Sequence, residues 1–163
     1  MTKDFFNLLK RLTNTKVNFV IVGGFAGVVY GCTVVTEDID ICCDFSPENL
    51  IRLQKALAEL HPVHRMTPKR IKFQLNKKNV EQFENLYLDT DICQLDCLSQ
   101  INGLGDFSEV KKSSVPIEVE GMKLYVLNID ALIKAKMVMN RPRDKEAVRQ
   151  LEEIKKLKKK SKK

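Results

Sequence analysis

The feature that most limits the fold of this 163-residue chain is an apolar run that ends at two glycines. Residues 17–22 read Val-Asn-Phe-Val-Ile-Val, and Gly23 and Gly24 follow directly. A β-branched, almost wholly apolar run of this length is typical of a strand that is buried in a sheet. The chain therefore has a buried strand close to its N-terminus, and a glycine pair marks the end of that strand.

Helical and strand patterns follow one another along the rest of the chain. We expect helices at residues 3–12, 25–30, 46–61, 129–140 and from 143 onward, and strands at 38–44, 70–75, 85–88, 92–98, 117–120 and 123–127. Ser46 and Asn128 are suitable N-caps, and Gly31 is suited to end the short second helix. Residues 101–116 contain Gly, Pro and few apolar repeats, which predicts a loop. No repeat or linker is present, so residues 1–154 are expected to form one α/β domain with a helical C-terminal cap.

The net charge of +7 is concentrated at the end of the chain. Residues 155–163 contain seven lysines and no acid, whereas residues 1–154 contain equal numbers of basic and acidic side chains. Such a run of like charges favours a disordered tail, which we expect beyond about Leu157. The lysines can attract the phosphates of RNA or another nucleic acid. The alternative is a solvated end that only keeps the protein soluble.

Several features are typical of a cytoplasmic protein. The chain has no run of 18 apolar residues, and its N-terminus lacks a basic start followed by an apolar stretch, so we expect neither a membrane span nor a signal peptide. The five cysteines are an odd number and include no Cys-x-x-Cys pair, which argues against zinc. We expect reduced and mostly buried thiols.

The segment with the clearest chemistry is Asp38-Ile-Asp40-Ile. Alternate side chains of a strand point to the same face, so the two carboxylates project together while the isoleucines pack into the core. Two carboxylates about 6.5 Å apart along a strand can converge on one or two divalent ions. Oxygen ligands favour Mg²⁺ or Mn²⁺. Acidic side chains on a strand can also be simply solvated, so this pattern is informative only in combination with others.

Two further features support a functional site. Gly23 and Gly24 precede a short helix, where backbone N–H groups can approach a phosphate without interference from a Cβ atom. Asp96 stands between apolar neighbours on a later predicted strand and can supply a third carboxylate. Asp89 and Asp91 are competitors for that role. The combination favours a metal and phosphate site over solvated acids.

These residues resemble the signature of the nucleotidyltransferase superfamily typified by DNA polymerase beta. The signature has an apolar residue and Gly-Gly, then Asp-apolar-Asp and a third carboxylate on a neighbouring strand, which Gly23-Gly24, Asp38-Ile-Asp40 and Leu95-Asp96-Cys97 match. The chain is most similar to a small bacterial branch that includes abortive-infection toxin-like and aminoglycoside-nucleotidyltransferase-like proteins. A closing segment of that branch corresponds to residues 130–136 and 141–144, and the resemblance spans residues 17–151.

The resemblance implies a mixed β-sheet flanked by helices and a transfer of a nucleoside monophosphate from an NTP to an acceptor hydroxyl. It implies that Asp38 and Asp40 hold the metal ions and that Asp96 completes the site and helps to deprotonate the acceptor. It also implies that Gly23 and Gly24 carry the triphosphate and that Lys136 lies near the phosphates, whereas Asp144 has a structural role. The acceptor and the oligomeric state stay open.

A second interpretation is a catalytically silent module of the same fold. Such a module would bind nucleic acid or a protein partner, as a component of a toxin–antitoxin pair does, and the lysine-rich tail is compatible with it. The three carboxylates favour the enzyme, because a module that only binds an anionic ligand has no need for clustered negative charge beside it.

Overall fold

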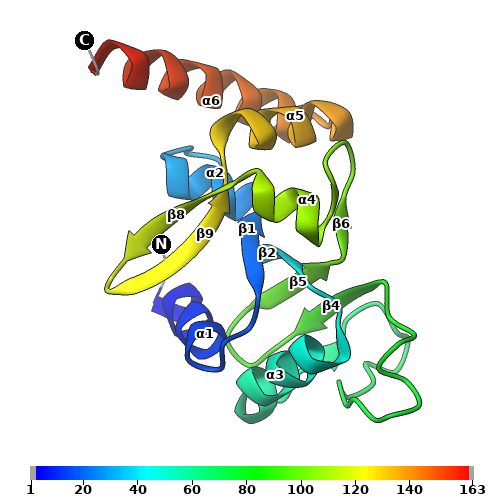
Figure 1. Cartoon of the computed structure of the whole chain (residues 1–163). Coiled ribbons are helices and arrows are strands. Elements are labelled where there is room, and N and C mark those ends of the chain that lie inside the picture. The colour runs from blue at the N-terminus through cyan, green and yellow to red at the C-terminus, as the bar shows by residue number, and fades with distance from the viewer. Residues whose placement is uncertain (1–2, 162–163) are drawn as a thin grey trace.

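A mixed sheet of seven strands forms the centre of the structure, a computed structural model in which residues 3–161 are described (Figure 1). Its strand order is β3-β4-β5-β2-β1-β9-β8. The strands are β1 (Phe19–Val22), β2 (Asp38–Cys43), β3 (Val63–His64), β4 (Asn85–Asp89), β5 (Gln94–Leu98), β8 (Ser114–Val119) and β9 (Met122–Leu127). Strand β2 pairs in parallel with β5 and antiparallel with β1, and β1 pairs in parallel with β9. The predicted mixed sheet is confirmed.

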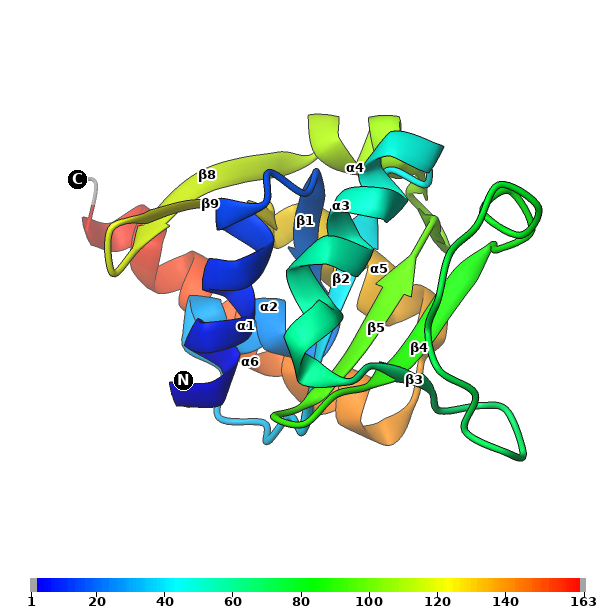
Figure 2. The same ribbon diagram turned by 90° about the horizontal axis from the view of Figure 1, so that it is seen from below.

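Helices cover both faces of this sheet. Helices α1 (Lys3–Asn14) and α3 (Pro47–Leu57) lie together on one face, in front of the sheet in Figure 2. Helices α2 (Gly23–Tyr30) and α5 (Ile129–Met139) lie on the other side, and α6 (Pro142–Ser161) packs against α5 (Figure 1). A short 3₁₀ helix, η1 (Ala58–Leu60), follows α3. The α/β architecture with C-terminal helices is the one expected.

The predicted helix ends are formed by the residues that the sequence indicated. The hydroxyl of Ser46 accepts a hydrogen bond from the backbone N–H of Asn49, and the side chain of Asn128 accepts one from Ala131 at 2.8 Å. Gly31 ends α2 in the left-handed region, with a φ of 108°. These caps satisfy backbone groups that have no partner within the helix.

Two of the local predictions are wrong. Residues 70–75, predicted as a strand, form only one isolated bridge, between Lys72 and Val63, because the positive φ of Arg70 turns the chain away from an extended path. Residues 101–116, predicted as a loop, contain ordered elements. Strands β6 (Gln100–Ile101) and β7 (Gly105–Asp106) form a small hairpin, and helix α4 (Phe107–Lys112) follows, capped by the Asp106 carboxylate on the N–H of Glu109.

The lysine-rich end also differs from the disordered tail that we expected beyond Leu157. Helix α6 continues to Ser161, and residues 162 and 163 lie outside the described part of the chain. The Lys155 ammonium pairs with the Asp130 carboxylate at 2.6 Å, and the Lys158 ammonium lies 4.7 Å from the centre of the Tyr30 ring. These contacts hold the lysine-rich turns against α5 and α2, which offsets the repulsion between the lysines.

The core contains the predicted thiols. Cys32, Cys42, Cys43 and Cys97 are buried and Cys93 is half-buried, and all five are free. This confirms that the cysteines are mostly buried. Within residues 3–161, no helix has both the length and the apolar character that crossing a bilayer requires.

Asn49 is a buried polar side chain that joins α3 to the sheet, since only 1% of it is exposed. Its Oδ1 accepts from the N–H of Asn18 at 2.7 Å, and its Nδ2 donates to the carbonyls of Asn18 and Asp44 at 3.1 and 2.7 Å. These bonds satisfy the backbone at the start of β1 and just after β2.

We predict that Asn49→Ala lowers the free energy of unfolding by about 1–3 kcal/mol, because it removes the side-chain partner of the Asn18 N–H and of the Asp44 carbonyl, whereas the Asn18 carbonyl still accepts from the Asp44 N–H. Urea denaturation measures the change. The matched control is Asn7→Ala on the exposed side of α1, which should change the same quantity by less than about 0.5 kcal/mol. Equal effects of the two substitutions would contradict the role of Asn49.

Candidate functional site

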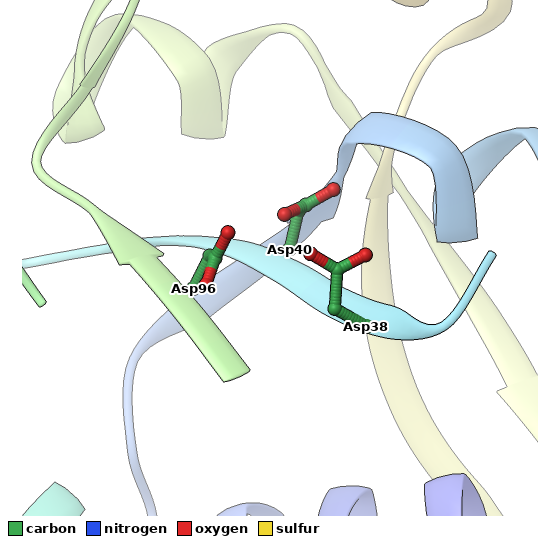
Figure 3. Close-up of side chains that lie close together, drawn as sticks. All are labelled: Asp38, Asp40 and Asp96. Atoms are coloured by element: carbon green, nitrogen blue, oxygen red, sulfur yellow. The ribbon is translucent and has the colours of Figure 1, made fainter. Parts of the chain in front are cut away.

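Three carboxylates meet on the face of the sheet that α2 and α5 partly cover. Asp38 and Asp40 alternate with buried isoleucines on β2, and the parallel register sets Asp96 of β5 beside Asp40. One oxygen from each of the three side chains lies within 4.8 Å of the others. Figure 3 shows the three side chains projecting to the same side of the sheet. The prediction that they share one cleft is confirmed.

Burial and neighbouring charges raise the pKa of two of these carboxylates, Asp40 and Asp96. The pKa of Asp40 is raised from 3.8 to about 7, chiefly by burial and then by the negative charges of Asp38 and Asp96, although a hydrogen bond from the N–H of Gly24 opposes the shift. Burial also raises the pKa of Asp96. Three hard oxygen donors with unbalanced negative charge form a donor set that suits a divalent cation such as Mg²⁺ or Mn²⁺. The residues present therefore fit the metal that the sequence predicted.

Arg65 contacts the third carboxylate and was not identified from the sequence. Its Nη2 donates to Asp96 Oδ1 at 2.7 Å, its Nη1 donates to the carbonyl of Leu88 at 3.3 Å, and its guanidinium lies 5.9 Å from the centre of the Tyr87 ring. This hydrogen bond lowers the pKa of Asp96 against the effect of burial. Arg65 follows the edge strand β3 and is 31 positions from Asp96, so no spacing rule in the sequence connects the two residues.

The two competing acids lie outside the cluster. Asp89 pairs with Arg70, and its Oδ1 lies 4.0 Å from Arg65 Nη1. Asp91 pairs with the exposed His61 at 2.7 Å, at the turn between β4 and β5. Of the three candidate acids from this region, only Asp96 joins Asp38 and Asp40.

The glycine pair forms the contact between β1, α2 and the carboxylates. Gly23 has a φ of 66°, and a Cβ atom at this position would lie 2.2 Å from Asp40 Oδ2. A Cβ on Gly24 would meet the Thr36 hydroxyl at 3.3 Å, and the same hydroxyl donates to the carbonyl of Asp38 at 2.9 Å. Because Gly23 and Gly24 lack side chains, the N-terminus of α2 can lie against the carboxylates of β2.

Positive side chains come from the last two helices. Lys136 of α5 is 7% exposed, and its ammonium makes no hydrogen bond or ion pair with any described residue. Burial lowers its pKa, against the opposing charges of Asp144, Cys32 and Asp40. Asp144 is buried and accepts hydrogen bonds from the backbone N–H of Arg141 at 3.1 Å and from its Nε at 2.6 Å, which fixes the start of α6.

The carboxylates, the glycines and these cations line a cleft with two parts. The smaller part, of about 60 Å³, lies at the N-terminus of α2 and is lined by Gly24, Thr36, Lys136 and Arg143 among others. The larger part, of about 430 Å³, extends along β5 and β4 past Asp96. Asp38, Asp40 and Lys136 line both parts. Carboxylates and cationic side chains thus face the same cleft.

A protein-family comparison identifies one matching family. The sequence family described as nucleotidyltransferase of unknown function (DUF6036) matches residues 3–159, nearly the whole chain. No curated protein sequence matches.

Several solved structures are similar to this one. The lincosamide antibiotic adenylyltransferase LnuA, solved with lincomycin bound, is 16% identical with a TM-score of 0.61, over 94% of this chain and 98% of its own. The antibiotic-resistance factor ANT(2'')-Ia is 14% identical with a TM-score of 0.59, over 91% and 80%. A Thermotoga maritima protein described as a nucleotidyltransferase is 19% identical with a TM-score of 0.57, over 92% and 94%. At these identities the likeness shows a shared fold.

We predict that the metal-free protein loses stability relative to its Asp40→Asn variant as the pH rises from about 5 to about 8. Because the pKa of Asp40 is about 7 in the fold and about 3.8 when unfolded, the unfolded chain binds fewer protons in this interval, and its formation becomes easier. The free-energy difference should change by about 1 kcal/mol or more. Urea titrations at several pH values measure it, and parallel pH profiles of the two proteins would contradict the raised pKa that burial and the neighbouring charges give Asp40.

Proposed function

Because the chain belongs to this nucleotidyltransferase family, we propose that it transfers a nucleoside monophosphate from an NTP to an acceptor hydroxyl in a reaction that requires a divalent metal. The observation that carries the proposal is the meeting of Asp38, Asp40 and Asp96 beside the N-terminus of α2. A helix N-terminus favours an anion, and clustered carboxylates favour a cation, so Mg²⁺-NTP suits both. NTPs are cytoplasmic metabolites, and the proposal therefore assumes a cytoplasmic protein.

The proposal assigns binding roles to the residues of the cleft. Asp38 and Asp40, with Asp96, would hold Mg²⁺ or Mn²⁺, which supplies charge neutralisation at the phosphates when bound. The backbone of Gly23 and Gly24 would contact the triphosphate. Lys136, a largely buried side chain that lines the cleft and whose ammonium has no ion pair in the described part of the chain, would donate to a phosphate oxygen.

The transfer itself is an in-line displacement. The acceptor oxygen forms a bond to the α-phosphorus, the bond from that phosphorus to the bridging oxygen breaks, and pyrophosphate leaves with the electron pair. The proton of the acceptor hydroxyl moves to a carboxylate oxygen of Asp96. Arg65 holds the other oxygen of that carboxylate at 2.7 Å, which keeps the group oriented during the transfer.

We predict that Asp38→Asn abolishes transfer while the protein stays folded, since it removes one ligand from a crowded anionic cluster. Each NTP, labelled at the α-phosphate, is incubated with Mg²⁺ or Mn²⁺ and cell extract, and label in a product together with pyrophosphate is measured. The matched control is Asp91→Asn, an exposed acid outside the cluster, which should keep more than about half of the activity. Equal activity of wild type and Asp38→Asn would contradict the assignment.

A catalytically silent module of this fold is the second candidate, and the same experiment separates the two. A silent module, including a toxin–antitoxin component that acts only by binding, would bind Mg²⁺-NTP or its partner without release of pyrophosphate. The specific feature in its favour is the lysine-rich end of α6, residues 155–161, which can bind phosphates of a nucleic acid.

We predict that Lys159→Gln together with Lys160→Gln weakens binding of single-stranded RNA if this end is a nucleic-acid site. Neither side chain has a hydrogen bond or ion pair within residues 3–161, so the fold should not change. The log–log salt slope of the affinity should fall by about 1.4, since each phosphate contact contributes about 0.7. Fluorescence anisotropy measures both. Unchanged affinity and slope would mean that the lysines only keep this surface solvated.

A further inference from the structure

The larger part of the cleft has a charged end and an uncharged end. The charged end contains the three aspartates and the cations of α5 and α6 described above. The uncharged end is lined by amide, aromatic and apolar side chains: Asn85, Tyr87, Leu98, Gln100, Asn102 and Met139 among them. This end comprises the lining residues contributed by β4, by Leu98 of β5, by residues 100–102 and by Met139, none of which is charged, while Arg141 and Arg143 of the same cleft follow Met139 along the chain.

Strand register produces this division. Tyr87 of β4 is the pairing neighbour of Asp96, and Asn85 is the neighbour of Leu98, which lies about 6.5 Å further along β5 on the same face. The uncharged end therefore begins directly beside the carboxylate to which we assign the acceptor proton. Arg65, which contacts Asp96 and is not part of the lining, has its charge balanced by Asp96 and Asp89.

The uncharged end retains free hydrogen-bonding groups. The side chains of Tyr87, Gln100 and Asn102 make no hydrogen bond with any described residue. The side-chain oxygen Oδ1 of Asn85 accepts from the backbone N–H of Ser99 at 3.2 Å, which leaves the side-chain amide N–H groups of Asn85 for a ligand. Several neutral donors and acceptors beside apolar contacts are the usual lining of a site for an uncharged polar molecule.

On the basis of the proposed transferase activity, we propose that the acceptor is a small, uncharged compound with several hydroxyl groups, bound between β4, the β6–β7 hairpin and the end of α5. A polycation would need carboxylates to replace its lost hydration, and a polyanion would need Lys or Arg; the uncharged end supplies neither. The cleft of about 430 Å³ must also hold part of the nucleotide, so the acceptor is small.

The position of the lysines also argues against a nucleic-acid acceptor. Lys155 pairs with Asp130 in the first turn of α5, whereas Met139, which lines the uncharged end, closes the same helix. Asp130 and Met139 are nine residues apart, about 13 Å along the helix axis, so Lys155 forms its ion pair at the opposite end of α5 from the acceptor end. Figure 1 shows the C-terminus of α6 on the opposite side of the molecule from β4 and β6.

The experiment sorts possible acceptors by charge before the reaction. Metabolites of a cell extract are separated on cation- and anion-exchange resins into cationic, anionic and neutral fractions, and RNA and protein form two further fractions. Each is incubated with the full-length protein, Mg²⁺ and NTP labelled at the α-phosphate. We expect label to pass to a compound of the neutral fraction.

The other outcomes distinguish a wrong acceptor class from the absence of transferase activity. Label in the cationic, anionic, RNA or protein fraction would overturn the acceptor class and leave the transferase intact. No label in any fraction, with Mg²⁺-NTP bound by the protein, would contradict the transferase itself and with it the acceptor.

A pair of charged variants tests the position of the acceptor. Gln100→Glu with Asn102→Asp preserves size but replaces amide N–H donors with carboxylates that must be desolvated when the acceptor binds, so about tenfold more of the neutral fraction should be needed for half-maximal transfer, with unchanged affinity for Mg²⁺-NTP. The control is Gln82→Glu, an exposed residue outside the cleft. If the double variant needs the same amount of the neutral fraction as the wild type for half-maximal transfer, the acceptor does not bind at this end of the cleft.

Discussion

The repulsion among three carboxylates on neighbouring strands is the constraint on which the rest of the site depends. Asp40 and Asp96 face each other across a parallel strand pair, and Asp38 lies two residues away, so the fold cannot separate their charges. Burial first, and then the negative charges of Asp38 and Asp96, raise the pKa of Asp40 in the protein alone. The sheet register holds the three carboxylates together at a cost in stability, and a bound cation would relieve that cost. The register therefore favours the metal-dependent chemistry that we propose.

The neighbouring cations offset only part of the negative charge of the three carboxylates. Arg65 is committed to Asp96, and Arg141 is committed to Asp144, so each guanidinium already has a carboxylate partner. Lys136 is the buried cation that the described contacts leave unpaired, and it lies in the cleft beside the glycine turn. The two ends of the cleft differ in the same way. Charged side chains line the part where the triphosphate would bind, and neutral side chains line the part where the acceptor would bind.

Local patterns allowed much of this architecture to be predicted from the sequence. Alternation along β2 predicted that Asp38 and Asp40 share a face, and Ser46 predicted the start of α3. Both predictions depend only on residues that are two or three positions apart in the sequence. The Arg65 contact could not be predicted, since it depends on where the edge strand β3 places a side chain far along the chain. The cap of α4 at Asp106 had a local signal, Asp followed three residues later by Glu109, which the neighbouring glycines obscured.

Anomalous diffraction from crystals grown with Mn²⁺ and a non-hydrolysable NTP analogue tests the central claim most directly. We predict a manganese peak at about 2.0–2.3 Å from carboxylate oxygens of Asp38 and Asp40, with the triphosphate at the N-terminus of α2. Manganese found only at other acidic groups, or an analogue bound with no metal beside these two aspartates, would contradict the claim that the carboxylate cluster exists to hold a divalent ion against a triphosphate.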